Sequence, residues 1–152
     1  MIQRIQSLYL LLITALLIAV LFLPFGFLKT PGETYEYTAF SIKQVLTGDA
    51  YVLPVWILAM LLVSGAALSF ITIFFYKRRK TQITLCFCGG IVLVLFYVVY
   101  STFLFMFIGK TGAENNTSFG MALPLISIIL DYMAINAIRK DEALVKSWDR
   151  IR

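Results

Sequence analysis

The residue whose type and setting could support chemistry is Asp131, an acid inside a long apolar run. A carboxylate near the middle of a membrane-spanning helix costs about 2.5–3.5 kcal/mol on insertion scales. Such a group faces a bundle interior or a cavity and is a candidate for binding a proton or a cation. A lone acid without a second acid, a histidine or a buried lysine makes a poor relay. We therefore favour a structural role for Asp131 and keep a proton or solute site as the alternative.

The residues around Asp131 predict a polar layer in the inner half of a helix bundle. Spacings of three and four place small and polar residues on one helix face: Gly120, Pro124, Ser127, Asp131 and Ala134. At the same depth, counted from the inner ends of the other apolar runs, lie Thr14, Ser69 and Gly89. Small residues let helices approach and hydroxyls bond across them. The predicted intramembrane polar layer is Asp131, Ser127, Thr14 and Ser69.

Metal, redox and acid–base chemistry have little support in the sequence. The chain has no histidine, which removes the commonest general base and zinc ligand. Cys86 and Cys88 are two residues apart, so on a helix they point in different directions and are expected to be apolar filler. We predict no metal, no cofactor, no catalytic residue and no enzyme. A membrane enzyme remains a third alternative.

Composition indicates that the elements holding Asp131 are membrane helices. The chain has 152 residues, of which 61% are hydrophobic and 14% charged. A soluble domain has about 25% charged residues and needs a polar shell. The length suits one domain, covering residues 1–152. Soluble enzyme classes are therefore disfavoured.

Four apolar runs reach the roughly 20 residues that cross the hydrocarbon core as helix. They cover residues 7–28, 52–76, 82–108 and 119–138, and only the last holds a charge. The first run is too long for a signal peptide and lacks a cleavage site. We predict an all-α, four-helix antiparallel membrane bundle. Aromatic residues of the third run, such as Phe96, Tyr100 and Phe105, are expected to face lipid rather than to line a pocket.

Charge asymmetry predicts the orientation of the bundle. Three of the 13 Lys and Arg residues, Lys29, Lys43 and Lys110, lie on one side. The other ten lie on the opposite side and include the cluster Lys77, Arg78, Arg79 and Lys80. Cytoplasmic loops carry the excess of Lys and Arg, so both ends are predicted to be cytoplasmic. The cluster is expected to contact anionic lipid, and we predict no nucleic-acid partner.

Two segments are predicted to lie on the outer side, at residues 29–51 and 109–118. In the first, residues 34–42 are rich in β-branched and aromatic side chains, which suit a short strand or hairpin arm. We favour an interfacial loop lying on the lipid headgroups. A recognition surface for a partner is the alternative.

The cytoplasmic tail, residues 139–152, carries an amphipathic pattern. Leu144, Trp148 and Ile151 recur at spacings of four and three among charged residues. The pattern predicts a short helix that continues from the fourth run and bends onto the inner leaflet, or docks on a partner.

Both ends of the chain resemble a known family. The opening MIQRIQSLYLL at residues 1–11 and the ending AIRKDEALVKSWDRIR at residues 137–152 are similar to a family of small four-helix bacterial inner-membrane proteins. That family is described as a domain of unknown function. The resemblance implies a multi-pass protein of the bacterial cytoplasmic membrane and carries no activity or ligand.

These observations together predict a non-enzymatic membrane protein that acts through protein–protein contacts. It would be an accessory or scaffold subunit, or a homo-oligomer, with the lipid bilayer as its other partner. The alternative is a small transporter or proton-coupled carrier that uses Asp131.

Overall fold

The computed structural model describes residues 3–45, 50–51, 55–76 and 78–149 of the chain. It consists mostly of four helices, each long and apolar enough to cross a membrane. Their bounds are α1 Gln3–Phe22, α2 Trp56–Phe74, α3 Arg79–Thr111 and α4 Ala122–Asp149. The four predicted helices are therefore confirmed, although the fold is not all-α.

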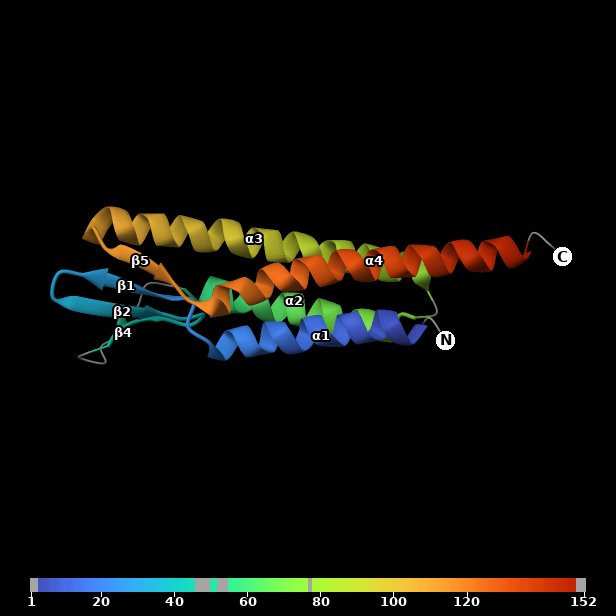
Figure 1. Ribbon diagram of the computed structural model, residues 1–152, viewed down its shortest axis with the longest axis horizontal. Coiled ribbons are helices and arrows are strands. Elements are labelled where there is room, and N and C mark those ends of the chain that lie inside the picture. Colours follow the sequence, from blue (N-terminus) through green and yellow to red (C-terminus); the bar gives the residue numbers. More distant parts are fainter. Residues whose placement is uncertain (1–2, 46–49, 52–54, 77, 150–152) are drawn as a thin grey trace.

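The helices pack in a ring in which α1 contacts α2 and α4, and α3 contacts the same two helices. Consecutive helices run in opposite directions, so α1 begins and α4 ends at the same end of the bundle (Figure 1). The core between them is aliphatic in α1 and α2, with Leu10, Ile13, Leu17, Leu58 and Leu62 fully buried. The outward faces are equally apolar, as lipid-facing surfaces are.

A five-stranded antiparallel sheet stands at the outer end of the bundle. Its strands are β1 Gly26–Thr30, β2 Glu33–Tyr37, β3 Ile42–Gln44, β4 Ala50–Tyr51 and β5 Glu114–Thr117, in the order β4-β3-β2-β1-β5. Gly26 lies opposite both Tyr37 of β2 and Thr117 of β5. The short strand or hairpin arm predicted within residues 34–42 is confirmed, because β2 covers most of its first half and pairs antiparallel with β3, which begins at Ile42. The location on the lipid headgroups that we favoured for this segment stays a prediction.

Local sequence explains where α1 stops and the sheet starts. We predicted a first span over residues 7–28, but α1 ends at Phe22 and Pro24 follows it closely. Proline cannot continue the backbone ladder of a helix, and the residue before it avoids helical angles. Alternation then takes over, since Phe25, Leu28, Tyr35 and Tyr37 are buried while Lys29 and Glu33 are exposed.

Helix α3 is much longer than α1 and α2 and supports the sheet. Its 33 residues span about 50 Å, against about 30 Å for the 20 residues of α1. The Tyr97 hydroxyl donates a 2.8 Å hydrogen bond to the Met121 carbonyl, which places Tyr97 level with the start of α4. The segment of α3 from Tyr100 to Thr111 lies beyond that level and, with β1–β5, forms what we call the head (Figure 1).

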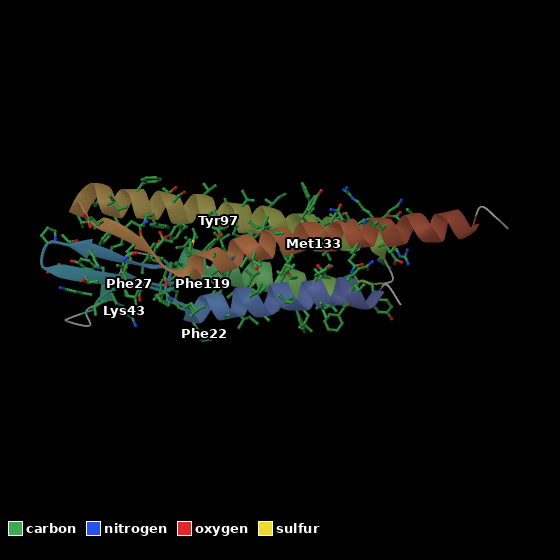
Figure 2. The ribbon with its side chains drawn as sticks, in the orientation of Figure 1. Phe22, Phe27, Lys43, Tyr97, Phe119 and Met133 are labelled. Carbon is green, nitrogen blue, oxygen red and sulfur yellow. The ribbon has the colours of Figure 1, made fainter. Side chains whose placement is uncertain are left out.

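The positions of labelled side chains along the molecule agree with this division. Figure 2 shows Phe22, Tyr97 and Phe119 near the same level, where α1 ends and α4 is about to begin. Phe27 and Lys43 lie beyond them in the sheet, and Met133 lies within the bundle. The molecule is thus a bundle of about one bilayer thickness with a folded head at one end.

At the other end, α4 continues past its neighbours to Asp149 (Figure 1). The predicted tail helix is therefore the last part of α4, and the picture shows it running on in the direction of the bundle rather than turning aside. The side chains of Leu144 and Trp148 and the whole of Ile151 lie outside the described part of the structure. The amphipathic role predicted for them stays a prediction.

Candidate functional site: the Asp131 groove

Asp131 lies on the side of α4 that faces α3, and its side chain is only 4% exposed. Its carboxyl group faces the Cys86 thiol and the backbone N–H of Gly90. Two glycines make the close approach possible. A methyl group added to Gly90 would lie 3.3 Å from Asp131 Oδ2, and one added to Gly89 would lie 3.8 Å from it. The carboxyl group therefore occupies space that a larger residue of α3 would partly fill.

A groove of about 280 Å³ opens beside this carboxyl group, between α3 and α4. Its lining residues are Phe87, Gly90, Ile91, Val94, Ile128, Asp131, Tyr132 and Ile135. The wall residues on each helix recur at spacings of three and four, so each helix supplies one continuous ridge. We call this cavity the Asp131 groove.

The electrostatic setting of the groove is unusual, because a carboxyl group borders an otherwise apolar cavity. No lysine or arginine occurs between Thr81 and Gly109 of α3 or in α4 before Arg139. Among the described residues, none forms a salt bridge with Asp131. Burying an isolated carboxylate in apolar surroundings is strongly unfavourable unless it is protonated or paired. The groove therefore offers an acceptor for a proton or a cation.

The other members of the predicted polar layer do not gather around Asp131. Thr14 and Ser127 donate hydrogen bonds to carbonyls one turn back on their own helices, those of Leu10 and Leu123. Ser69 is buried in α2. Within the described structure no hydrogen bond joins any of these hydroxyls to Asp131. The contacts of Asp131 run instead to Cys86 and Gly90 of α3, and the polar layer stays a prediction.

The two cysteines point to different surroundings, as their spacing predicts. Cys86 is buried beside Asp131, whereas Cys88 is exposed on α3. No group of three or more potential metal ligands occurs in the described part of the chain.

Polar side chains tie the helices together at the end of the bundle where α1 begins and α4 ends, and no sequence pattern pointed to them. Arg79 forms a 2.8 Å salt bridge with Asp141 and also donates to the Asp141 backbone carbonyl. Gln6 of α1 donates a 3.2 Å hydrogen bond to the Ala137 carbonyl of α4. Arg79 thus links α3 to α4, and the lipid contact predicted for the basic cluster stays a prediction. Arg78 and Lys80 are exposed, and Lys77 lies outside the described residues.

An aromatic cluster lies where the head meets the bundle, between the sheet and α3. Phe25 makes edge contacts with Tyr37, Phe96 and Tyr100, at ring-centroid distances of 5.7–5.9 Å. Tyr37 stacks on Tyr100 at 5.5 Å, and burial raises the pKa of the Tyr37 phenol well above its usual range. Phe96 and Tyr100 therefore belong to the core and do not face lipid as predicted.

Comparison with known proteins identifies a family and no activity. No curated protein matches the chain significantly. A family model described as Domain of unknown function (DUF4293) matches residues 2–151, nearly the whole chain. The four-helix layout and the Asp131 groove both lie within that match, which also bears out the resemblance seen at the two ends. The chain therefore belongs to the DUF4293 family.

Proposed function

We propose that this protein is a multi-pass protein of the bacterial inner membrane with both ends in the cytoplasm. Four apolar helices, each at least 18 residues long, support membrane insertion. The Lys and Arg residues gather at the end where α1 begins and α4 ends, which supports the orientation. In this placement the head lies outside the cytoplasm and the last turns of α4 lie inside it.

Reporter enzymes fused to the chain test this orientation. Fusions after Lys80 and after Arg152 should be active as cytoplasmic reporters, and a fusion after Lys110 should be active as a periplasmic reporter. A periplasmic signal after Lys80 would overturn the orientation.

We further propose that the protein acts through contacts, as an accessory or scaffold subunit or as a homo-oligomer, and not as an enzyme. The observation that carries this proposal is the exposed apolar surface of the head. Phe105 is 72% exposed, and its neighbour Met106 is exposed as well. Phe105 lies eight residues, or about 12 Å, beyond Tyr97 and hence beyond the level where α4 begins. Apolar side chains held outside the hydrocarbon core mark an interaction surface.

A photo-reactive amino acid placed at Phe105 tests the contact proposal. The matched control carries it at Ile129, which is also apolar and exposed (55%) but lies in α4 eight residues past Met121, within the proposed membrane span. We expect a discrete protein adduct from position 105 and lipid adducts from position 129. The adduct should contain the protein that co-purifies in constant ratio after mild extraction, or a second copy of the chain. Lipid adducts alone at position 105 would contradict the proposal.

The Asp131 groove favours a second candidate, a small proton-coupled carrier. A buried carboxyl group beside a cavity that opens toward lipid can take up and release a proton. The purified protein in liposomes that hold a pH-sensitive dye should then speed proton entry, and Asp131→Asn should abolish the effect. Equal proton entry with and without the substitution would remove this candidate.

A further inference from the structure

The shape of the Asp131 groove restricts what can enter it. Phe87, Ile91 and Val94 form the wall on α3, and Ile128, Tyr132 and Ile135 form the wall on α4. Each wall spans eight residues of helix, a rise of about 10 Å. The cavity of about 280 Å³ is just below the range of about 300–1,000 Å³ that is usual for ligand sites. The groove thus suits a compact organic molecule.

The chemistry of the groove restricts the ligand further. Its floor carries the buried carboxyl group of Asp131, to which the described residues supply no cationic partner. Two of its wall residues are aromatic, Phe87 and Tyr132, and these side chains are 63% and 66% exposed. A carboxylate together with aromatic rings attracts organic cations by direct charge and by cation–π interaction. The remaining walls are aliphatic and match apolar substituents.

We propose that the Asp131 groove binds one lipophilic organic cation per chain, with the positive charge against the Asp131 carboxylate and the apolar substituents between the two walls. The ligand enters sideways from the lipid, because the wall side chains lie on the outward faces of α3 and α4. This inference rests on the proposed membrane insertion, but it does not depend on the accessory role or on proton transport.

Binding is measured with the full chain in nanodiscs of zwitterionic lipid, which carries no net charge. The probe is methyltriphenylphosphonium, and the matched neutral probe is triphenylphosphine oxide, which has nearly the same shape. We expect saturable binding of one phosphonium per chain, with the neutral probe binding at least about tenfold more weakly. A charge-assisted contact in apolar surroundings accounts for a difference of this size.

Three variants locate the site. Asp131→Asn removes the charge and keeps the size of the side chain. Ile91→Trp keeps the carboxyl group and fills the groove from an exposed position, so it is expected to fold. Glu114→Gln removes one charge from the exposed strand β5 and is the control. We expect phosphonium affinity to fall at least about tenfold in the first two variants and to stay unchanged in the third.

The outcomes separate this inference from the proposed function. Equal affinity in the parent protein and in Ile91→Trp would overturn it, and this result remains decisive even if Asp131→Asn fails to fold. Equal binding of the two probes would also overturn it, since the groove would then be a site for neutral lipid tails. The reporter fusions after Lys80 and Lys110 test membrane insertion separately, so a failure of binding would not be mistaken for a wrong location.

Discussion

Two tyrosines of the head bury hydroxyl groups for which the described residues supply no hydrogen-bond partner. They are Tyr37 of β2 and Tyr100 of α3, whose rings stack on each other. A third tyrosine, Tyr97, has a partner in the Met121 carbonyl. The three side chains have the same chemical structure, so differences between them measure the effect of their surroundings.

Replacing Tyr37 with phenylalanine is expected to leave stability unchanged or to raise it. The substitution removes a buried polar group that has no partner among the described residues, and it keeps the ring contacts with Phe25 and Tyr100. Tyr97→Phe is the matched control and should lower the free energy of unfolding by about 0.5–1.5 kcal/mol, because it removes a made hydrogen bond. Denaturant unfolding in detergent measures both. A larger loss for Tyr37→Phe than for Tyr97→Phe would contradict the prediction.

The same residue predicts how stability responds to alkaline pH. Burial is the main cause that raises the pKa of the Tyr37 phenol above its ordinary value of 10.0, and Tyr100 adds to it. The unfolded chain therefore loses this proton at lower pH than the folded protein does. Below about pH 10 the phenol is protonated in both the folded and the unfolded state, so the full free energy of unfolding is present. As the pH rises above that value the unfolded chain loses the proton first, and the free energy of unfolding falls. Unfolding free energies measured across this range should fall less steeply in Tyr37→Phe than in the parent protein, whereas parallel curves would show that the phenol does not contribute.

At the scale of elements, the junction between α1 and β1 depends on a close backbone contact. Gly120, in the short helical turn before α4, lies against Pro24, and a methyl group added to it would lie 2.6 Å from the Pro24 carbonyl oxygen. That distance is far inside van der Waals contact, and the obstructing atom belongs to the backbone. The two chain segments that connect bundle and head therefore fit together only with glycine at this position.

Gly120→Ala is expected to destabilise the protein by about 1–3 kcal/mol, the usual range for overpacking. Gly109→Ala is the control, because a methyl group at Gly109 meets nothing within 4 Å and alanine favours helix. Thermal unfolding in one detergent compares the two variants. If both substitutions shifted the midpoint equally, the contact with Pro24 would not be the reason.

The elements differ in how far the sequence predicts them. Apolar runs of about 20 residues predict four helices because the hydrogen-bonding needs of the backbone in lipid leave few alternatives. Strand β1 could not be separated from the run before it, because Phe25, Phe27 and Leu28 are as apolar as the end of α1. Strand β5 has the sequence ENNT, which has low strand propensity, and it pairs with β1 through tertiary context.

The candidate site was predictable in its central residue and not in its surroundings. Asp131 stands out because an acid in an apolar run is rare. Its contacts with Cys86 and Gly90 depend on how α3 is rotated against α4. That rotation follows from the packing of whole helix faces, and periodicity alone does not determine it when both faces of a helix are apolar.

At the scale of the whole molecule, the proposed membrane placement together with the length difference between α1 and α3 puts the head outside the bilayer. The apolar window of α1, Ile5–Phe22, has 18 residues and spans about 27 Å, close to the roughly 30 Å of a hydrocarbon core. A bilayer matched to that window ends near Tyr97 of α3. Phe105 is then reached by water, and Ile129, which lies in α4 about two turns past its start, is not.

Cysteine labelling tests this depth in a chain whose native cysteines are replaced by alanine. A water-soluble maleimide should modify Phe105→Cys in intact membranes and leave Ile129→Cys unmodified, although both side chains are exposed in the isolated molecule. Labelling of both positions after solubilisation is the control for reactivity. Protection of Phe105→Cys in the membrane would mean that the head is embedded in lipid.

The order of strands in the sheet also has a consequence for biosynthesis. Strand β1 pairs on one side with β2, which follows it directly, and on the other side with β5, which follows α3. Residues 31–113 must be synthesised before that second pairing can form, which takes roughly 4–17 s at about 5–20 residues per second. During this interval the nascent chain presents an open edge on β1, and the arrival of β5, which follows α3, closes it. In the proposed membrane placement the head is therefore completed only after the third helix has crossed, so its assembly would report that insertion of that helix has succeeded.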